Sequence, residues 1–476
     1  MKPFRLVSLS IILILNILLS YTTAFADTKT DKTTSWPKAP SLISKASIVM
    51  DANTGVILYQ NNANEKLYPA SITKIMTALV ALENSSLDEV VTFSNDAVYG
   101  IEKNSSNVGV YVGEQMTMEQ CLYAMLLESA NEVSTGIAEH IAGSVEAFTK
   151  LMNAKAKELG CKNTHFTNAN GLHDDNHYTS AYDMALISQE AYKYSTFRTI
   201  ISTKQFIVPS TNMREEPLYF NNHHEMMNPR KYLRYRYEYC TGGKTGYTDM
   251  AKNTLVSYAT KDGVDLICVV MKSKNGQQPQ NIFSDTIDLF DYVFNNFTQY
   301  SINDDMDTAS FDSSQLFTRF NNIFSSKHSP ISISNKGNIL IPNSVSLEQT
   351  TRTIEYDENV TIKEGENIIG HIVYTYGDRT VGRTDIIYTS TKDTLNFGTE
   401  ILKKNTSDNQ LIQLITKNDS DEISLVKVLL VIGVIIFILI AVYFALQIRK
   451  RKKDNTINTK RRKKFSRKHY NDFMNF

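Results

Sequence analysis

Hydrophobic positions in the first part of the chain recur at two different spacings. Short runs at residues 47–51 and 55–59 predict two strands, and the Asn-Thr-Gly turn between them indicates a hairpin. Apolar residues three and four positions apart predict helices over residues 71–83 and 118–141, the second interrupted near residue 130. The remaining predicted elements are helices at 145–159 and 282–297 and strands at 254–260 and 264–271. Helices and strands are mixed without regular alternation, which favours the α+β class.

The pattern changes beyond residue 300. Short alternating runs separated by polar turns predict a small all-β domain over residues 301–395, and a polar stretch at 396–427 predicts a stalk. The strand candidates of the small domain are residues 338–342, 351–356, 359–362, 368–376 and 384–390. We therefore expect two folded domains, a larger one over residues 45–300 and this smaller one.

Two uncharged apolar runs lie outside these domains. Residues 6–19 follow two basic residues and precede an Ala-Phe-Ala sequence, which is typical of a cleaved signal peptide over residues 1–26. An uncleaved N-terminal anchor is the alternative. Residues 27–44 are polar and form a predicted lead-in linker. The second run, residues 428–446, is just long enough for a transmembrane helix across a hydrocarbon core of about 30 Å.

Charge is unevenly distributed, although 50 basic and 50 acidic residues give a net charge of zero. Residues 447–476 contain twelve basic and two acidic residues, whereas residues 27–446 contain 36 basic and 48 acidic ones. Basic flanks stay on the cytoplasmic side of a membrane span. We therefore predict a single-pass protein of the cell membrane, with its larger domain on the extracytoplasmic side and a basic cytoplasmic tail. The acidic body argues against nucleic acid as a partner.

Four cysteines are spread widely over the exported part, at Cys121, Cys161, Cys240 and Cys268. Their spacing matches no metal-ligand pattern. An even number outside the cell permits disulfides, but a chain of this length can bury a core without them. We expect buried free thiols, with one disulfide as the alternative.

Ser71 and Lys74 form the first candidate chemical group. Pro69 precedes them and a predicted helix follows, so Ser71 lies at a helix N-terminus, where free backbone N–H groups favour developing negative charge. Lys74 lies three residues on, and therefore on the same face. A desolvated lysine can accept the proton of a serine nucleophile. Alone, this tetrapeptide is more often a capping serine followed by an exposed lysine.

Two further motifs are equally weak alone. Ser129 and Asn131 interrupt a predicted helix, and they offer a hydroxyl that can relay a proton and an amide that can hold a carbonyl. Lys244 and Thr245 lie at a strand edge and can bind a carboxylate, while Gly246 allows a ligand to approach the backbone closely. The alternative for Ser129 and Asn131 is a simple helix break, and the alternative for Lys244 to Gly246 is a glycine-rich strand end.

The three motifs in this order are far more specific. Ser-x-x-Lys, Ser-x-Asn and Lys-Thr-Gly mark penicillin-binding proteins and class A β-lactamases, although Ala130 stands where the middle motif commonly has aspartate. The chain resembles the secreted D-alanyl-D-alanine carboxypeptidases, the low-molecular-mass penicillin-binding proteins, over about residues 45–300. The segments that carry the resemblance are residues 68–79, 127–132, 139–143, 159–166 and 243–249, with weaker likeness at 362–366 and 381–383. The C-terminal membrane attachment also fits that family.

This resemblance implies a serine β-lactamase/transpeptidase-like catalytic domain that needs no metal or cofactor. It implies that Ser71 is the acylated nucleophile, Lys74 its general base and Ser129 a proton relay. The implied substrate-binding residues are Asn131, Lys244, Thr245, Gly246 and Tyr247, and the backbone N–H groups of Ser71 and Tyr247 would form an oxyanion hole.

Some residues depart from the family or suggest other chemistry. The strand that follows Lys-Thr-Gly ends in Met-Lys-Ser-Lys-Asn-Gly, where Lys272 or Lys274 could supply a substrate-contacting cation. Histidines and aspartates at 173–177 could suggest a metal site, but the resemblance places a metal-free loop there. We expect His223 and His224 to be an exposed pair.

The leading functional hypothesis is a serine D,D-carboxypeptidase that removes the terminal D-alanine from peptidoglycan pentapeptide stems and is also acylated by β-lactams. A β-lactamase is the first alternative, although no deacylation loop of the Glu-x-x-Leu-Asn kind is evident. A membrane-bound β-lactam sensor is the second, although the short tail leaves no room for a folded effector. The expected partners are stem peptides, β-lactams as inhibitors, and membrane lipid.

Overall fold

The computed structural model describes residues 36–229, 233–274, 280–302, 331–357, 360 and 363–390. Through residue 301, its elements are β1 (Ala46–Asp51), β2 (Ile57–Asn61), η1 (Ala70–Thr73), α2 (Lys74–Asn84), β3 (Val90–Thr92), α3 (Asn95–Tyr99), β4 (Gln115–Thr117), α4 (Met118–Leu127), α5 (Asn131–Ala142), α6 (Val145–Glu158), α7 (Ala181–Tyr192), α8 (Ser195–Ser202), β5 (Gln205–Val208), β6 (Leu218–Asn221), η2 (Leu233–Tyr235), β7 (Cys240–Thr248), β8 (Lys252–Lys261), β9 (Val264–Ser273), α9 (Gln280–Asn296) and β10 (Phe297–Ser301).

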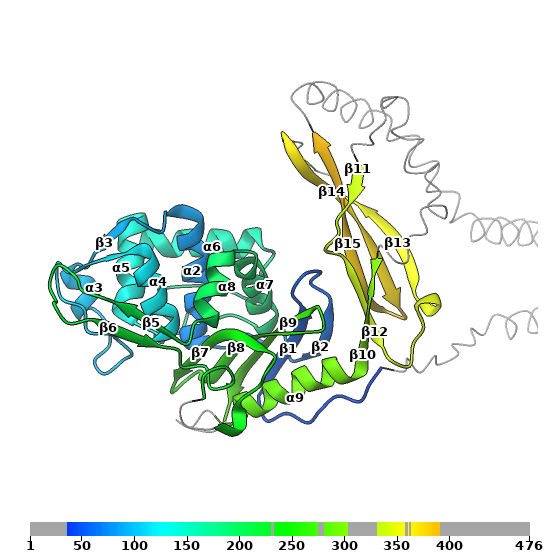
Figure 1. The fold of residues 1–476 in the computed structure, drawn as a ribbon, viewed down its shortest axis with the longest axis horizontal. Helices are drawn as coiled ribbons and strands as arrows, with labels where there is room; N and C mark the ends of the chain where they lie inside the picture. Colours follow the sequence, from blue (N-terminus) through cyan, green and yellow to red (C-terminus); the bar gives the residue numbers. More distant parts are fainter. Residues whose placement is uncertain are drawn as a thin grey trace, which may run out of the picture. The chain divides into compact units, whose positions relative to one another are not determined.

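A five-stranded sheet in the order β2-β1-β9-β8-β7 forms the centre of the larger domain (Figure 1). Every pairing in it is antiparallel. The turn between β8 and β9 places Asp262 and Gly263 at φ values of 51° and 84°, which suits the tight hairpin predicted there. Because β1 pairs with β9, the beginning and end of the domain lie side by side, and β7 is left at one edge of the sheet.

The two faces of the sheet are covered by different helices (Figure 1). Successive side chains of a strand point to opposite faces. Along β9, Ile267 and Val269 therefore join the core of the multi-helix layer, whereas Leu266 and Cys268 join the core beneath α9. This two-sided packing leaves β8 and β9 almost continuously buried, and it makes the sheet a rigid support for β7.

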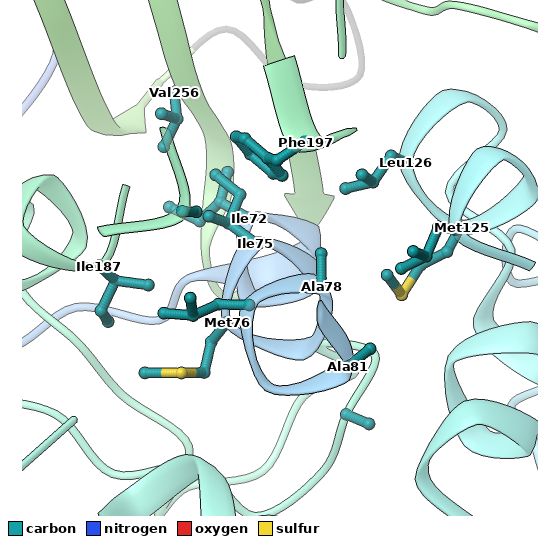
Figure 2. Packing of buried hydrophobic residues seen from close by; sticks show 14 of the residues in the cluster. Ile72, Ile75, Met76, Ala78, Ala81, Met125, Leu126, Ile187, Phe197 and Val256 are labelled. Atoms are coloured by element: carbon teal, nitrogen blue, oxygen red, sulfur yellow. The ribbon is translucent and has the colours of Figure 1, made fainter. Parts of the chain in front are cut away.

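Helix α2 lies at the centre of the multi-helix layer. All of its residues from Lys74 to Ala81 are buried, so the helix has no solvent-facing stripe over its first two turns. Figure 2 shows Ile75 and Met76 in this core with side chains from the surrounding helices and the sheet. Lys74 begins this helix and is buried with it. The alternative of an exposed lysine is therefore wrong.

The smaller β-rich part is built from β10, β11 (Ile331–Ile333), β12 (Asn338–Pro342), η3 (Leu347–Gln349), β13 (Thr351–Tyr356), β14 (Gly365–Tyr376) and β15 (Arg379–Ser390). Its sheet has the order β10-β12-β15-β14-β13, and β11 also pairs with β15. Ile339, Ile341, Ile372 and Val381 lie in its core. An all-β fold was predicted for this part of the chain, but β10 begins at Phe297 and crosses the expected boundary at residue 300.

Most predicted elements recur, with some differences at their ends. The expected helix at 71–83 begins as the 3₁₀ turn η1, and its α-helical part starts at Lys74. Strands β14 and β15 begin three and five residues earlier than predicted. The strand candidate at 359–362 lies almost entirely outside the described residues.

All four cysteines are free thiols, as expected. Cys121, Cys240 and Cys268 are buried, whereas Cys161 is only partly buried. Within the described ranges, no helix is both long and apolar enough to cross a bilayer. The predicted signal peptide, stalk, transmembrane helix and basic tail all lie outside those ranges.

Candidate active site

Ser71 lies on a strained elbow directly before α2. Ala70 adopts φ 54°, a left-handed conformation that costs a non-glycine residue of order 1–3 kcal/mol. The Thr254 hydroxyl donates to the carbonyl of Pro69 at 2.7 Å and holds the elbow from β8. A Cβ at Gly171 would lie 2.0 Å from the Ala70 carbonyl oxygen, so only glycine fits against it. Contacts far apart in sequence therefore enforce the conformation that presents Ser71.

The ammonium group of Lys74 has three polar neighbours. Its Nζ lies 3.0 Å from Ser71 Oγ, 2.6 Å from Asn131 Oδ1 and 2.5 Å from the carbonyl oxygen of Asn170. The last two atoms can only accept hydrogen bonds. A neutral amine has two N–H groups and one lone pair. With both N–H groups donated to Asn131 and Asn170, the lone pair is left facing the Ser71 hydroxyl.

The surroundings of Lys74 favour this neutral form. Complete burial lowers the pKa of Lys74 well below its usual value, and the positive charge of Lys244 lowers it further. The Glu132 carboxylate acts the other way, but burial raises the pKa of Glu132 itself. Glu132 is also held through its Oε1, which accepts from the N–H groups of Val108 at 2.6 Å and Gly109 at 3.1 Å.

Ser129 and Asn131 occupy the connection between α4 and α5. Ser129 adopts φ 62°, which breaks the helix at the place that the sequence predicted. Asn131 begins α5, and its N–H donates to the carbonyl of Ser106 at 2.9 Å. This sharp connection turns the Asn131 amide toward Lys74, so two motifs that lie 57 residues apart meet at one nitrogen atom.

Strand β7 brings the third motif to the same place. Lys244 is buried, and its Nζ donates to the carbonyl of Thr245 at 2.9 Å. Burial lowers the pKa of Lys244 to about 7. A Cβ at Gly246 would lie 2.8 Å from the backbone nitrogen of Ser71, so the glycine lets the strand pass directly over the nucleophile. Tyr247 follows on the same exposed edge of the sheet.

One cleft of about 1020 Å³ collects these groups. The predicted site residues that line it are Ser71, Ser129, Asn131, Thr245, Gly246 and Tyr247. Lys74 and Lys244 are buried in its walls. The structure therefore brings all eight predicted site residues together, six at the cleft surface and two behind it.

Several contributors were missed by the sequence analysis. The Asn170 carbonyl contacts Lys74 and Gly171 packs against Ala70, and only the Asn-Gly dipeptide indicated a loop there. Glu128 and His223 form an ion pair at 2.9 Å beside the cleft. Neither residue is part of the three short motifs, and their pairing depends on a contact between the end of α4 and the segment after β6.

The loop considered for metal binding has another use. His177 is buried, and its Nε2 lies 2.8 Å from Thr73 Oγ1 while Nδ1 accepts from the Thr167 N–H at 3.1 Å. Burial lowers the pKa of His177 to about 3, so the imidazole is neutral. His173 instead lies edge-on to the ring of Tyr68. These histidines support the turn before α2.

The expectation of an exposed His223–His224 pair is wrong for His224. Its side chain is buried, with Nε2 2.8 Å from Ser257 Oγ. The Asn222 side chain accepts from the His224 N–H and turns the chain inward. A Cβ at Gly243 would lie 2.7 Å from Nε2, so the glycine makes room for the imidazole. His223 is exposed, as expected.

Lys272 and Lys274 are not among the residues that line the cleft. Lys272 instead adopts φ 55° at an irregularity in the pairing of β8 with β9. The cationic side chains at the cleft surface come from other segments, namely Lys103 and, when protonated, His223. A role of Lys272 or Lys274 in substrate binding stays a prediction.

Comparison with known sequences agrees with this geometry. A sequence model of the D-alanyl-D-alanine carboxypeptidase family, peptidase S11, matches residues 32–275, just over half of the chain. The chain belongs to this family. The D-alanyl-D-alanine carboxypeptidase DacF of Bacillus subtilis is 34% identical over 263 residues, which are 54% of this chain and 64% of DacF. DacA of Escherichia coli is also 34% identical, over 49% of this chain and 57% of DacA. The chain thus spans less than two thirds of either relative.

Solved structures of DD-peptidases match the larger domain. The Streptomyces K15 DD-transpeptidase has a TM-score of 0.50 and 29% identity, with 54% of this chain and 100% of that chain covered. A D-alanyl-D-alanine carboxypeptidase from Mycobacterium tuberculosis has a TM-score of 0.50 and 28% identity, with 55% and 94% covered. The α+β domain that carries the cleft therefore has the fold of these DD-peptidases.

Proposed function

We propose that the protein is a serine D,D-carboxypeptidase that removes the terminal D-alanine from peptidoglycan pentapeptide stems. The observation that carries this proposal is the environment of Lys74. Its two acceptor-only neighbours leave one lone pair for the proton of Ser71. A serine hydroxyl becomes a useful nucleophile when a positioned base removes this proton. Family membership supports the same reaction class.

Acylation would begin when Ser71 Oγ attacks the carbonyl carbon between the two terminal D-alanines. Lys74 accepts the hydroxyl proton as the new C–O bond forms. The backbone N–H groups of Ser71 and Tyr247 stabilise the oxyanion, since Gly246 allows β7 to pass close to the Ser71 nitrogen. The C–N bond then breaks, and Ser129 relays a proton from Lys74 to the departing amine. D-Alanine leaves and an acyl-enzyme remains.

The terminal carboxylate of the substrate would bind at β7. Thr245 lines the cleft and offers its hydroxyl, and Lys244 supplies positive charge from behind the strand. Asn131 lines the opposite side and can hold a substrate amide through its own N–H groups. Water then attacks the acyl-enzyme with Lys74 as base, which frees Ser71. A β-lactam carries an equivalent carbonyl and carboxylate, so it would acylate the same serine.

The test uses the full chain in mild detergent with a pentapeptide that ends in D-Ala-D-Ala and, separately, with penicillin. We expect release of free D-alanine and a penicillin adduct in the intact mass. Ser71→Ala should lose both, because both reactions need the same oxygen atom. An adduct that persists in the variant, or maps to another serine, would contradict the assignment. Rapid penicillin hydrolysis without peptide turnover would indicate a β-lactamase, and a stable adduct without turnover would indicate a sensor.

We also propose that the protein is exported and anchored by residues 428–446, with the catalytic domain outside and the tail at 447–476 inside. The apolar length and the basic flank of this segment support that topology. Every proposed catalytic residue lies between 71 and 247, so truncation after residue 427 should release a soluble, active enzyme. Protease added to intact cells should cut the catalytic domain and spare the tail. A protected catalytic domain would contradict the topology.

A further inference from the structure

Thr77 lies on α2 three residues after Lys74 and has no part in the chemistry proposed so far. Residues three apart share one face of a helix. The side chain of Thr77 is fully buried, and its Oγ1 donates to the carbonyl of Ala169 at 2.6 Å. A threonine inside a helix often bonds to a carbonyl of its own preceding turn. Thr77 instead holds a segment 92 residues further along the chain.

The next carbonyl of that segment is an acceptor for Lys74. Lys74 Nζ lies 2.5 Å from the carbonyl oxygen of Asn170, which directly follows Ala169. Two neighbouring carbonyls of one loop therefore accept from two side chains on one face of α2. The Ala169 carbonyl belongs to the planar peptide unit that leads into Asn170. Because Thr77 holds this peptide unit, it limits where the Asn170 carbonyl can point.

Other contacts of the loop have different effects. The Asn168 side chain accepts from the Gly171 N–H at 2.7 Å, which closes the loop on itself and does not tie it to α2. His177 ties the beginning of the loop to η1 through its two ring nitrogens. The hydroxyl of Thr77 adds a tie between the body of α2 and the peptide unit next to the Asn170 carbonyl.

We infer that Thr77 is a positioning residue that fixes the Asn170 carbonyl and thereby directs the lone pair of Lys74 at Ser71. This inference rests on the proposed function, in which the neutral amine of Lys74 is the base. If the Asn170 carbonyl moves away, one N–H group of the amine loses its acceptor and the amine can rotate about its bond to the side chain. Its lone pair then faces the Ser71 hydroxyl only part of the time, whereas the binding groups on β7 stay in place.

The test mixes the full chain in mild detergent with increasing concentrations of a fluorescent penicillin. Thr77→Val keeps nearly the same side-chain volume but removes the hydroxyl. We expect the maximal rate of acylation to fall about 10- to 100-fold, because a displaced base loses much of its contribution. The half-saturating concentration should stay at the wild-type value, and labelling at the end point should reach the wild-type level. Thr77→Ser restores a hydroxyl and should recover most of the rate.

Thr286→Val is the matched control. Thr286 on α9 is equally buried, donates to the carbonyl of Ile282 in its own helix at 2.7 Å, and does not line the cleft. Its variant should be acylated at the wild-type rate. An equal loss of rate in Thr286→Val would show a general effect of removing a buried hydroxyl and would overturn the inference.

Three further outcomes are decisive. A wild-type rate in Thr77→Val would overturn the inference. A Thr77→Ser variant that stays slow and labels to a lower end point would show a merely structural role, which also overturns it. A wild-type protein that forms no penicillin adduct and releases no D-alanine from the pentapeptide would instead overturn the proposed function, and this inference with it.

Discussion

The start of α2 and the middle of β7 each bury a lysine beside the same cleft, but they surround it differently. Lys74 has three polar neighbours within 3.0 Å, of which two are pure acceptors and one is the Ser71 hydroxyl. Lys244 donates to the neutral carbonyl of Thr245, and the charge of Glu128 opposes the lowering of its pKa by burial. Burial lowers the pKa of both lysines. In the proposed mechanism, these different neighbours make Lys74 the base and leave Lys244 as the cation.

This contrast explains how one site can hold two lysines without redundancy. The charge of Lys244 lowers the pKa of Lys74, so keeping Lys244 protonated helps to keep Lys74 neutral. In the proposed mechanism, Lys74 accepts a proton while the substrate carbonyl is attacked, and Lys244 attracts the substrate carboxylate. An exchange of their surroundings would remove both functions.

The largest expected effect comes from Lys74→Arg. Arginine keeps the positive charge but cannot give up its proton near neutral pH, so it cannot act as the base. We expect the second-order rate of acylation by a fluorescent penicillin to fall by about 10²–10⁴-fold, the usual contribution of general base catalysis. Acylation close to the wild-type rate would assign the base to another residue and would end the comparison between the two lysines.

Lys244→Met should have a smaller and different effect. The substitution keeps much of the apolar stem but removes the charge behind Thr245. Loss of a hydrogen bond to a charged group costs about 1.5–3 kcal/mol, so kcat/KM for a D-Ala-D-Ala peptide should fall roughly 10- to 150-fold, mainly through KM. Steady-state kinetics separate the two constants. A fall in kcat alone would place Lys244 in the chemical step instead.

Much of this contrast could be read from the sequence, and some of it could not. The motifs at Ser71, Ser129 and Lys244 marked the groups, because short local patterns predict a helix start, a helix break and a glycine-rich strand, whereas the roles of these groups came from the family resemblance. The Asn170 carbonyl and the Glu128–His223 pair depend on contacts between segments almost a hundred residues apart. Local periodicity does not predict contacts between distant segments, so the different surroundings of the two lysines could not be predicted from the sequence.

The sequence predicted the fold to a similar extent. Long periodic segments such as α6 and the β8–β9 hairpin were predicted closely, because burial on a defined face imposes their pattern. Short elements such as α3, α8 and the β5–β6 hairpin were not, since few apolar positions fall within each. The burial of His224 was mispredicted because Gly243, far along the chain, provides the space for it.

Glu132→Gln should have the smallest effect on the rate of acylation, but the direction in which it shifts the pH dependence is informative. The variant keeps an acceptor for Val108 and Gly109 but removes the negative charge near Lys74. That charge raises the pKa of Lys74, so the variant should have a lower one. Because acylation needs the neutral amine, the rate is lost as pH falls through the pKa of Lys74. The acid limb of the rate profile should therefore move to lower pH. A move to higher pH would contradict this electrostatic account.

The most direct test of the central claim is a side-chain NMR titration of the lysines, with Lys74 and Lys244 assigned through their arginine variants. Lys74 should lose its proton at a lower pH than Lys244. The positive charge of Lys244 lowers the pKa of Lys74, and Glu132, which raises it, is itself harder to ionise because burial raises its own pKa. The charge of Glu128 raises the pKa of Lys244. Both should titrate far below exposed lysines. A Lys74 signal that stays protonated after Lys244 has been neutralised would contradict the proposed assignment of Lys74 as the base and Lys244 as the group that holds the carboxylate.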